Sequence, residues 1–464
     1  MARRRESAQR EDSVTIAEQL GAFATAVDAA TLPTKVRGTI RHLLYDVAGL
    51  CVAARNTDYV AAAVASAAST GTATAFGHAV GFSPYDAALI NGTAAHGEDY
   101  DDTFEGGPVH AGAVIVPAVL ALAEYRGLHG AAVMRGLAAG TEIMCRMSLV
   151  APQAIHKAGF HPTAVIGAPA AAAGAGAALG LPARQIAAAI GIAGSLASGI
   201  IEYLADGAST KRLHAGAAAQ SGIRAALLAE AGFSGPLSVL EGSHGFYKAF
   251  APSRTPDFAP LLDGLGSHWL LENLAFKPYA CGTMTQPFID CAIELARSGV
   301  RADDIVSMVC EVGEGTVHRL WEPLDSKRTP PNGYAGKFST PYCIAVGFVD
   351  GKAGFEQFTN ERVRDPNLRA LAAKVSYVID PANEYPRNFS GHIRATLKNV
   401  SVREVRRAHM RGGAREPLPD ADILAKYRDN IRFGGWPADQ SERFAAAIET
   451  IVRGGAVDFA MARR

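Results

Sequence analysis

Residues Asn91–Gly112 read NGTAAHGEDYDDTFEGGPVHAG and lie between two apolar segments with helical spacing. The stretch holds four carboxylates within Glu98–Asp102 and a histidine toward each end. Asp99 and Thr103 are four residues apart, so they share a face if the first helix runs on that far. The glycines and proline of Glu105–Pro108 must then break the helix. Such a stretch is either a functional loop on a rigid helical frame or a solvated loop with an Asp cap.

The segments on both sides of this stretch repeat apolar residues at helical spacing from about residue 15 to residue 200. His110 comes just before the apolar run 111–124, so it lies near a predicted helix start. Residues 164–183 carry no charge, but most are Ala or Gly and two prolines interrupt them. We therefore expect a buried helix of a soluble protein here rather than a membrane span.

The hydrophobic period changes after a proline-rich stretch at residues 252–260. Beyond it, alternating apolar residues predict strands at 305–312, 375–379 and 392–397, with a further candidate at 400–405. The sequence predicts a mainly α protein with two parts. They are an all-α helical bundle domain over about residues 13–265, completed by helices within 420–460, and a smaller α+β domain over about 270–405.

Composition excludes several classes of function. Basic and acidic residues number 45 each, which leaves no overall positive field for nucleic acid. The six cysteines are scattered without a C-x-x-C pair, which argues against iron–sulfur or structural zinc sites and fits a reduced cytoplasmic protein. The N-terminal MARRRESAQREDS has no apolar core and is not a secretory signal. Neither G-x-G-x-x-G after a strand nor G-x-S-x-G occurs. We expect no metal, no cofactor, no nucleic acid and no membrane.

Two other short polar segments carry candidate functional residues. His161, in Gly159-Phe-His161-Pro-Thr163, lies near a predicted helix N-terminus, which suits anions. Lys211 and His214 open another helix and share a face. A cation at a helix start opposes the helix dipole, so Lys211 does not serve helix stability. The segment is either an exposed basic turn or part of an anion site.

The stretch His96-Gly-Glu-Asp99-Tyr-Asp-Asp-Thr103 with His110 resembles the signature of the MmgE/PrpD family. That family includes 2-methylcitrate dehydratase, cis-aconitate decarboxylase and iminodisuccinate epimerase. The resemblance continues through G-F-H-P at His161, K-x-x-H-A-G at Lys211 and a K-P-Y motif at Lys277, and spans about residues 15–450.

The chain departs from that pattern at two places, because the family often has His or Arg near Gly282 and His near Gln286. The resemblance implies a homodimer in which the second domain acts as a lid over the helical one. The K-P-Y motif adds Lys277 to the candidate residues, and the loop that leads into a buried helix within residues 333–351 adds Lys337 and Tyr342. We expect these catalytic residues: His110, Asp99, His161 and Tyr342. We expect these substrate-binding residues: Thr103, Lys211, His214, Lys277 and Lys337.

In detail, we expect His110 to be the principal acid/base, since imidazole both takes and gives a proton near neutrality. Asp99 would orient it or a neighbouring group, and Lys211 would pair with a substrate carboxylate. Thr103 and His161 would hydrogen-bond the substrate, and Tyr342 would reach in from the lid.

Such a set suits a small polycarboxylate substrate that loses a proton beside a carboxylate. The first expectation is a lyase that dehydrates a 2-hydroxy polycarboxylate. Epimerisation or decarboxylation of a related acid uses the same groups and is the alternative. A helical binding protein without chemistry is an alternative of another class, and there the candidate residues would scatter rather than converge.

Overall fold

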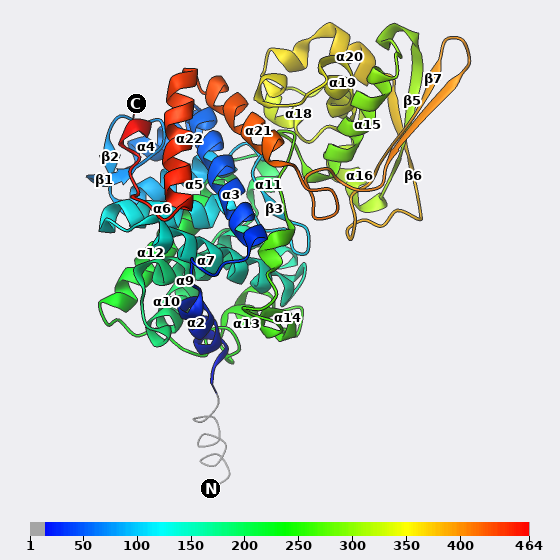
Figure 1. The fold of residues 1–464 in the computed structure, drawn as a ribbon. Coiled ribbons are helices and arrows are strands. Elements are labelled where there is room, and N and C mark those ends of the chain that lie inside the picture. Colours follow the sequence, from blue (N-terminus) through cyan, green and yellow to red (C-terminus); the bar gives the residue numbers. More distant parts are fainter. Residues whose placement is uncertain (1–13, 464) are drawn as a thin grey trace.

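Long helices build the N-terminal half of the chain in the computed structural model, which describes residues 14–463 (Figure 1). The helices are α2 (Ile16–Ala26), α3 (Thr34–Ala54), α4 (Asp58–Ala65), α5 (Pro84–His96), α6 (Gly112–Arg126), α7 (Gly130–Leu149), α8 (Ala154–Lys157), α9 (Pro162–Leu179), α10 (Ala183–Leu196), α11 (Tyr203–Asp206), α12 (Thr210–Glu230), α13 (Phe246–Phe250) and α14 (Ala259–Leu262). The long helices lie in the region where apolar residues recur at helical spacing, whereas the short helices α8, α11, α13 and α14 were not predicted.

Helix α9 lies in the centre of this bundle and packs against α7, α10 and α12. Small residues allow the close approach: a Cβ added to Gly136 of α7 would come within 2.7 Å of the Gly174 carbonyl oxygen. A Cβ on Gly222 of α12 would come within 2.3 Å of the Ala171 Cβ. Among the described helices, α9 alone is long and apolar enough to cross a membrane, and 89% of it is buried in the protein. It is a core helix, as the sequence predicts.

The N-terminal part is not purely helical, which corrects the expectation of an all-α domain. Strands β1 (Thr70–Thr74) and β2 (Gly81–Phe82) form an antiparallel hairpin, so the helical pattern stops where α4 ends at Ala65 and resumes at α5. β-Branched threonines favour strand over helix in this run. Strand β3 (Thr103–Phe104) pairs with β4 (Leu274–Ala275).

The C-terminal part holds a mixed four-stranded sheet in the order β6-β5-β7-β8. Strand β5 (Ile305–Val312) pairs in parallel with β6 (Val375–Ile379) and antiparallel with β7 (Gly391–Leu397), and β7 pairs antiparallel with β8 (Val402–Arg407). All four predicted strands are confirmed within two residues. The helices of this part are α15 (Gln286–Arg297), α16 (Glu314–Leu320), α17 (Leu324–Arg328), α18 (Gly333–Gly336), α19 (Thr340–Asp350) and α20 (Pro366–Ala372).

After the sheet the chain returns to the N-terminal helices. Helices α21 (Asp420–Phe433) and α22 (Ala438–Val452) both pack against α3, and Figure 1 shows them in orange and red beside the blue start of the chain. A buried ion pair joins Lys426 of α21 to Asp46 of α3, with Nζ 2.6 Å from Oδ1. Lys426 also donates to the Tyr100 carbonyl at 2.6 Å, so the C-terminal helix supports the loop that carries the carboxylates.

Candidate active site

The loop after α5 does not continue the helix but turns away from its axis. Helix α5 ends at His96, and Asp99 takes a left-handed backbone conformation with φ of 56°. Asp99 and Thr103 therefore do not share a helical face. Thr103 pairs with Ala275 through strands β3 and β4, which brings Lys277, two residues further on, beside the loop. Thr103 thus acts on the site at least through its backbone, by positioning Lys277.

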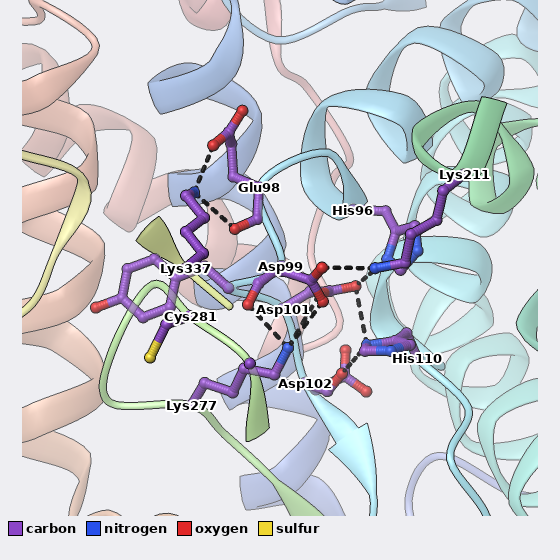
Figure 2. A network of polar contacts seen from close by, with 12 residues as sticks. His96, Glu98, Asp99, Asp101, Asp102, His110, Lys211, Lys277, Cys281 and Lys337 are labelled. Atoms are coloured by element: carbon purple, nitrogen blue, oxygen red, sulfur yellow. Dashed lines mark hydrogen bonds and ion pairs between the residues drawn. The ribbon is translucent and has the colours of Figure 1, made fainter. Parts of the chain in front are cut away.

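Asp99 lies between two lysines from distant parts of the chain (Figure 2). Its Oδ2 is 2.6 Å from Lys211 Nζ, its Oδ1 is 3.4 Å from Lys277 Nζ, and its carbonyl accepts from Lys277 at 2.8 Å. Burial raises the pKa of the Asp99 carboxyl, but the two lysine charges outweigh burial and lower it below its usual value. For Lys211 burial lowers the pKa, yet Asp99 leaves it above its usual value. Lys211 therefore has a partner carboxylate before any ligand enters.

Asp101 is the carboxylate beside His110, whereas we expected Asp99 to orient His110 or a neighbouring group. Its Oδ2 is 2.7 Å from His96 Nδ1 and 3.3 Å from His110 Nδ1. Burial raises the pKa of Asp101, but His110 and His96 together hold it well below its usual value. Each Nδ1 thus faces oxygens that only accept, since His110 Nδ1 also lies 2.7 Å from the Asp102 carbonyl. Each Nδ1 then carries the proton, and each Nε2 is left as a base.

The other two carboxylates of the stretch have structural partners. Asp102 accepts from the backbone N–H groups of Ala111 at 3.1 Å and Gly112 at 2.9 Å, where α6 begins. Burial, and then the neighbouring carboxylates, hold the pKa of Asp102 well above its usual value. Glu98 pairs with Lys337, whose Nζ also donates to the Glu98 carbonyl at 2.8 Å. The four acidic residues within Glu98–Asp102 therefore each bind a different set of partners.

Four imidazole rings form a continuous row behind these carboxylates. His110 and His96 have ring centroids 4.8 Å apart, His96 and His161 5.5 Å, and His161 and His214 5.3 Å. His161 is the N-cap residue of α9, and His214 lies one turn after Lys211 on α12. Burial, followed by the charges of His96 and Lys211, lowers the pKa of both His161 and His214, the latter to about 4.

The candidate residues largely converge. One connected cluster contains six of them: His110, His161, His214, Asp99, Lys211 and Lys277. Lys337 joins this cluster through Glu98. Tyr342 does not point to this cluster: its hydroxyl donates to the Gln357 carbonyl at 2.6 Å, and its ring packs against Phe358.

Sequence reasoning assigned no role to His96 or Asp101, although both lie in the quoted motif. The signal was present, because a carboxylate five residues after a histidine at a helix end can fold back onto it. Tyr203 of α11 was also missed, and its ring lies 6.4 Å from that of His161 and 5.8 Å from that of His214.

One group of potential metal-binding residues occurs within residues 14–463: His96, Asp101 and His110 have ligand-type atoms within 4.8 Å of one another. The Nδ1 atoms that face the carboxylate are at hydrogen-bonding distance from it or from the Asp102 carbonyl. These distances fit hydrogen bonds among the three side chains. Metal-independent activity stays a prediction.

The sequence also matches the models of a known protein family. Residues 18–259 match the model of the MmgE/PrpD N-terminal domain, and residues 279–451 match that of the MmgE/PrpD C-terminal domain. The chain is 31% identical over 366 residues to cis-aconitate decarboxylase of Mus musculus, which covers 75% of this chain and 72% of that protein. It is 28% identical over 426 residues to cis-aconitate decarboxylase of Aspergillus terreus, covering 86% and 85%. Mitochondrial 2-methylcitrate dehydratase of Yarrowia lipolytica is 26% identical over 254 residues, covering 52% and 47%.

Proposed function

The chain belongs to the MmgE/PrpD family, and from that premise we propose that it is a lyase acting on a small polycarboxylate. The observation that carries the proposal is the buried cluster in which Lys211 and Lys277 meet a row of four histidines. Ammonium groups attract carboxylates, and imidazoles transfer protons near neutral pH. The similarity to enzymes that are named decarboxylase and dehydratase supports the same class of reaction.

In the first version of the reaction the enzyme dehydrates a 2-hydroxy polycarboxylate. His110 Nε2 takes a proton from the carbon next to a carboxylate, with His110 held in place by Asp101 and the Asp102 carbonyl. Negative charge moves onto that carboxylate, where Lys211 and Lys277 stabilise it. The C–O bond then breaks, and the imidazolium of His161 or His214 protonates the departing hydroxyl. One proton and one hydroxide leave as water.

Decarboxylation of an unsaturated tricarboxylate is the second candidate. The decarboxylases from Mus musculus and Aspergillus terreus align over 75% and 86% of this chain, against 52% for the dehydratase. Here an imidazolium adds a proton to one alkene carbon, and the electron pair of the C–CO2 bond forms the new double bond as CO2 departs. The lysines hold the remaining carboxylates. Epimerisation needs the same proton transfers without loss of a group.

A substrate panel tests these alternatives. Purified protein is incubated with citrate, 2-methylcitrate and cis-aconitate, and products are followed by ultraviolet absorbance of the double bond and by mass spectrometry. Loss of water identifies a dehydratase, loss of CO2 a decarboxylase, and an unchanged mass with changed configuration an epimerase. His110→Gln serves as the matched control for contaminating activity. Binding of these acids without turnover would favour a non-catalytic binding protein and refute the proposed activity.

A further inference from the structure

Every lysine of the site is already paired with a carboxylate. Lys211 pairs with Asp99, Lys277 lies near both Asp99 and Asp101, and Lys337 pairs with Glu98. The three lysine charges thus meet three carboxylate charges before a ligand binds. The next cation along α12, Arg212, lies between the rings of Tyr59 and Tyr334 and donates to the Gly97 carbonyl. A ligand with two or three carboxylates therefore brings more negative charge than the site has free positive charge.

The His161–His214 pair can supply the missing positive charge. The two Nδ1 atoms are 3.2 Å apart, so one of them must donate a proton and the other must accept it. With both rings neutral, the donor ring has a bare Nε2 and the acceptor ring carries an Nε2–H. The pair therefore has room for one more proton, on the bare Nε2.

The surroundings of this pair distinguish it from the other two histidines. The groups that face it are His96 from α5, His110 from the loop before α6, Lys211 from α12, and Tyr203 from α11. Within residues 14–463 no carboxylate forms an ion pair with either ring, whereas His96 and His110 already have Asp101. A carboxylate brought by a ligand to these rings would be the first to pair directly with either of them. Ligand binding therefore changes the electrostatic environment of this pair most.

We propose that His161 and His214 take up one proton from solvent when a polycarboxylate binds, and that this proton is the one delivered to the substrate. The inference rests on the proposed function insofar as the ligand is a polycarboxylate. The protonated pair offers two Nε2–H donors, one of which gives its proton to the leaving hydroxyl or to the alkene carbon. In the dehydration the total is balanced, since His110 gains the proton taken from carbon and returns it to solvent. In the decarboxylation the proton stays in the product.

The sign of the pH dependence follows from the charges. Burial, followed by the nearby His96 ring and the Lys211 charge, depresses the pKa of both rings in the empty site, to about 4 for His214. A bound carboxylate raises it. At a pH between the pKa of the pair in the empty site and its higher pKa in the complex, binding takes up a proton. The affinity for the anion therefore falls as pH rises. In that range the Kd should increase about tenfold per pH unit for uptake of about one proton.

The test uses tricarballylate, which has three carboxylates but no hydroxyl or double bond to react. Isothermal titration is run at about pH 7.5, where free carboxylates are ionised, in buffers with different ionisation enthalpies. The slope of the observed enthalpy against the buffer enthalpy gives the number of protons taken up. We expect about one for the wild type, and close to zero for the double variant His161→Gln/His214→Gln. The variant His244→Gln, which alters an exposed histidine outside the site, is the matched control and should keep the wild-type value.

Several results would overturn the proposal. No uptake, or release of protons, in the wild type contradicts it directly, and so does a Kd that does not rise with pH. Undiminished uptake in the folded double variant would place the proton on His96, His110 or the ligand itself. If the double variant does not fold, the single variants His161→Gln and His214→Gln are compared with the wild type. An unchanged pH dependence of Kd in both then counts against the pair. Failure of tricarballylate, citrate and cis-aconitate to bind at all would instead refute the polycarboxylate function.

Discussion

Replacing Asp101 by Asn separates catalysis from binding, because Asp101 acts on the histidines rather than on the ligand. The substitution keeps the shape of the side chain but removes a negative charge 3.3 Å from His110 Nδ1 and 2.7 Å from His96 Nδ1. A unit charge at 3.3 Å stabilises a His110 imidazolium by about 5 kcal/mol at an effective dielectric constant of 20. That energy corresponds to nearly four powers of ten in rate and is an upper limit. General acid/base factors of about 10²–10⁴ bracket the same range. We therefore expect kcat of Asp101→Asn to fall by about 10²–10⁴-fold.

The effect on binding should have the opposite sign. Asp101 Oδ1 lies 4.0 Å from Lys277 Nζ, so removal of this carboxylate makes the lysine more available to an anion. The KM for a polycarboxylate should stay constant or decrease while kcat falls. Steady-state kinetics on the substrate that the panel identifies measure both constants. Asp350→Asn is the control, since it removes a partly buried carboxylate that pairs with Arg362 outside the cluster, and it should leave both constants unchanged. A kcat of Asp101→Asn within threefold of wild type, or a KM that rises steeply, would refute this account of how Asp101 acts on His96 and His110.

Four further predictions concern single residues, metals and assembly. His110→Gln should lower kcat by about 100-fold or more with unchanged circular dichroism; turnover near the wild-type rate would move the principal acid/base role to another histidine. Lys211→Ala should mainly raise KM, more so at low salt, since it removes a charge that pairs with anions and salt screens that attraction in the wild type; a loss confined to kcat would contradict a binding role. Activity should survive EDTA, and stoichiometric zinc or iron lost together with activity would refute this. Light scattering at micromolar concentration should give the mass of a homodimer, and a monomer would contradict that expectation.

The sequence identified the elements of the site better than their pairings. The histidines and carboxylates of residues 96–110 are local in sequence, so a chemistry-dense stretch between apolar helices reveals them. Strands β5 and β7 were predictable because alternate residues along each of them are buried. The hairpin β1–β2 was not, because a short threonine run has no extended period of its own. The domain bounds near residue 265 and the role of the second part as a lid stay predictions.

Which carboxylate meets which cation depends on geometry that residue types do not encode. The left-handed backbone of Asp99 turns its side chain toward Lys211 and Lys277, and Asp101, two residues later, then faces the histidines. The direction of the Tyr342 side chain, on a helix, could not be predicted from the sequence either. Helix α19 is buried through most of its length, so its apolar pattern does not define which face looks toward the site. The side chain turned out to face the Gln357 carbonyl.

The departures from the family pattern at Gly282 and Gln286 act on different parts of the site. Gln286 holds the turn that follows Lys277, since its Nε2 donates to the carbonyls of Tyr279 and Cys281, both at 3.0 Å, and its Oε1 accepts from the Tyr279 N–H at 3.2 Å. A neutral imidazole has one donor and one acceptor and could not make all three bonds. Gly282 contributes to the turn only through its backbone: its N–H donates to the Lys337 carbonyl at 2.9 Å, and its carbonyl accepts from the Thr285 hydroxyl at 2.7 Å. A Cβ there would lie 3.5 Å from the Lys337 carbonyl oxygen, an ordinary contact. The backbone thus tolerates a side chain at 282, beside the Lys337 carbonyl and the Phe338 ring. The turn after Lys277 is therefore secured by the Gln286 amide, and an effect of the glycine on substrate choice stays a prediction.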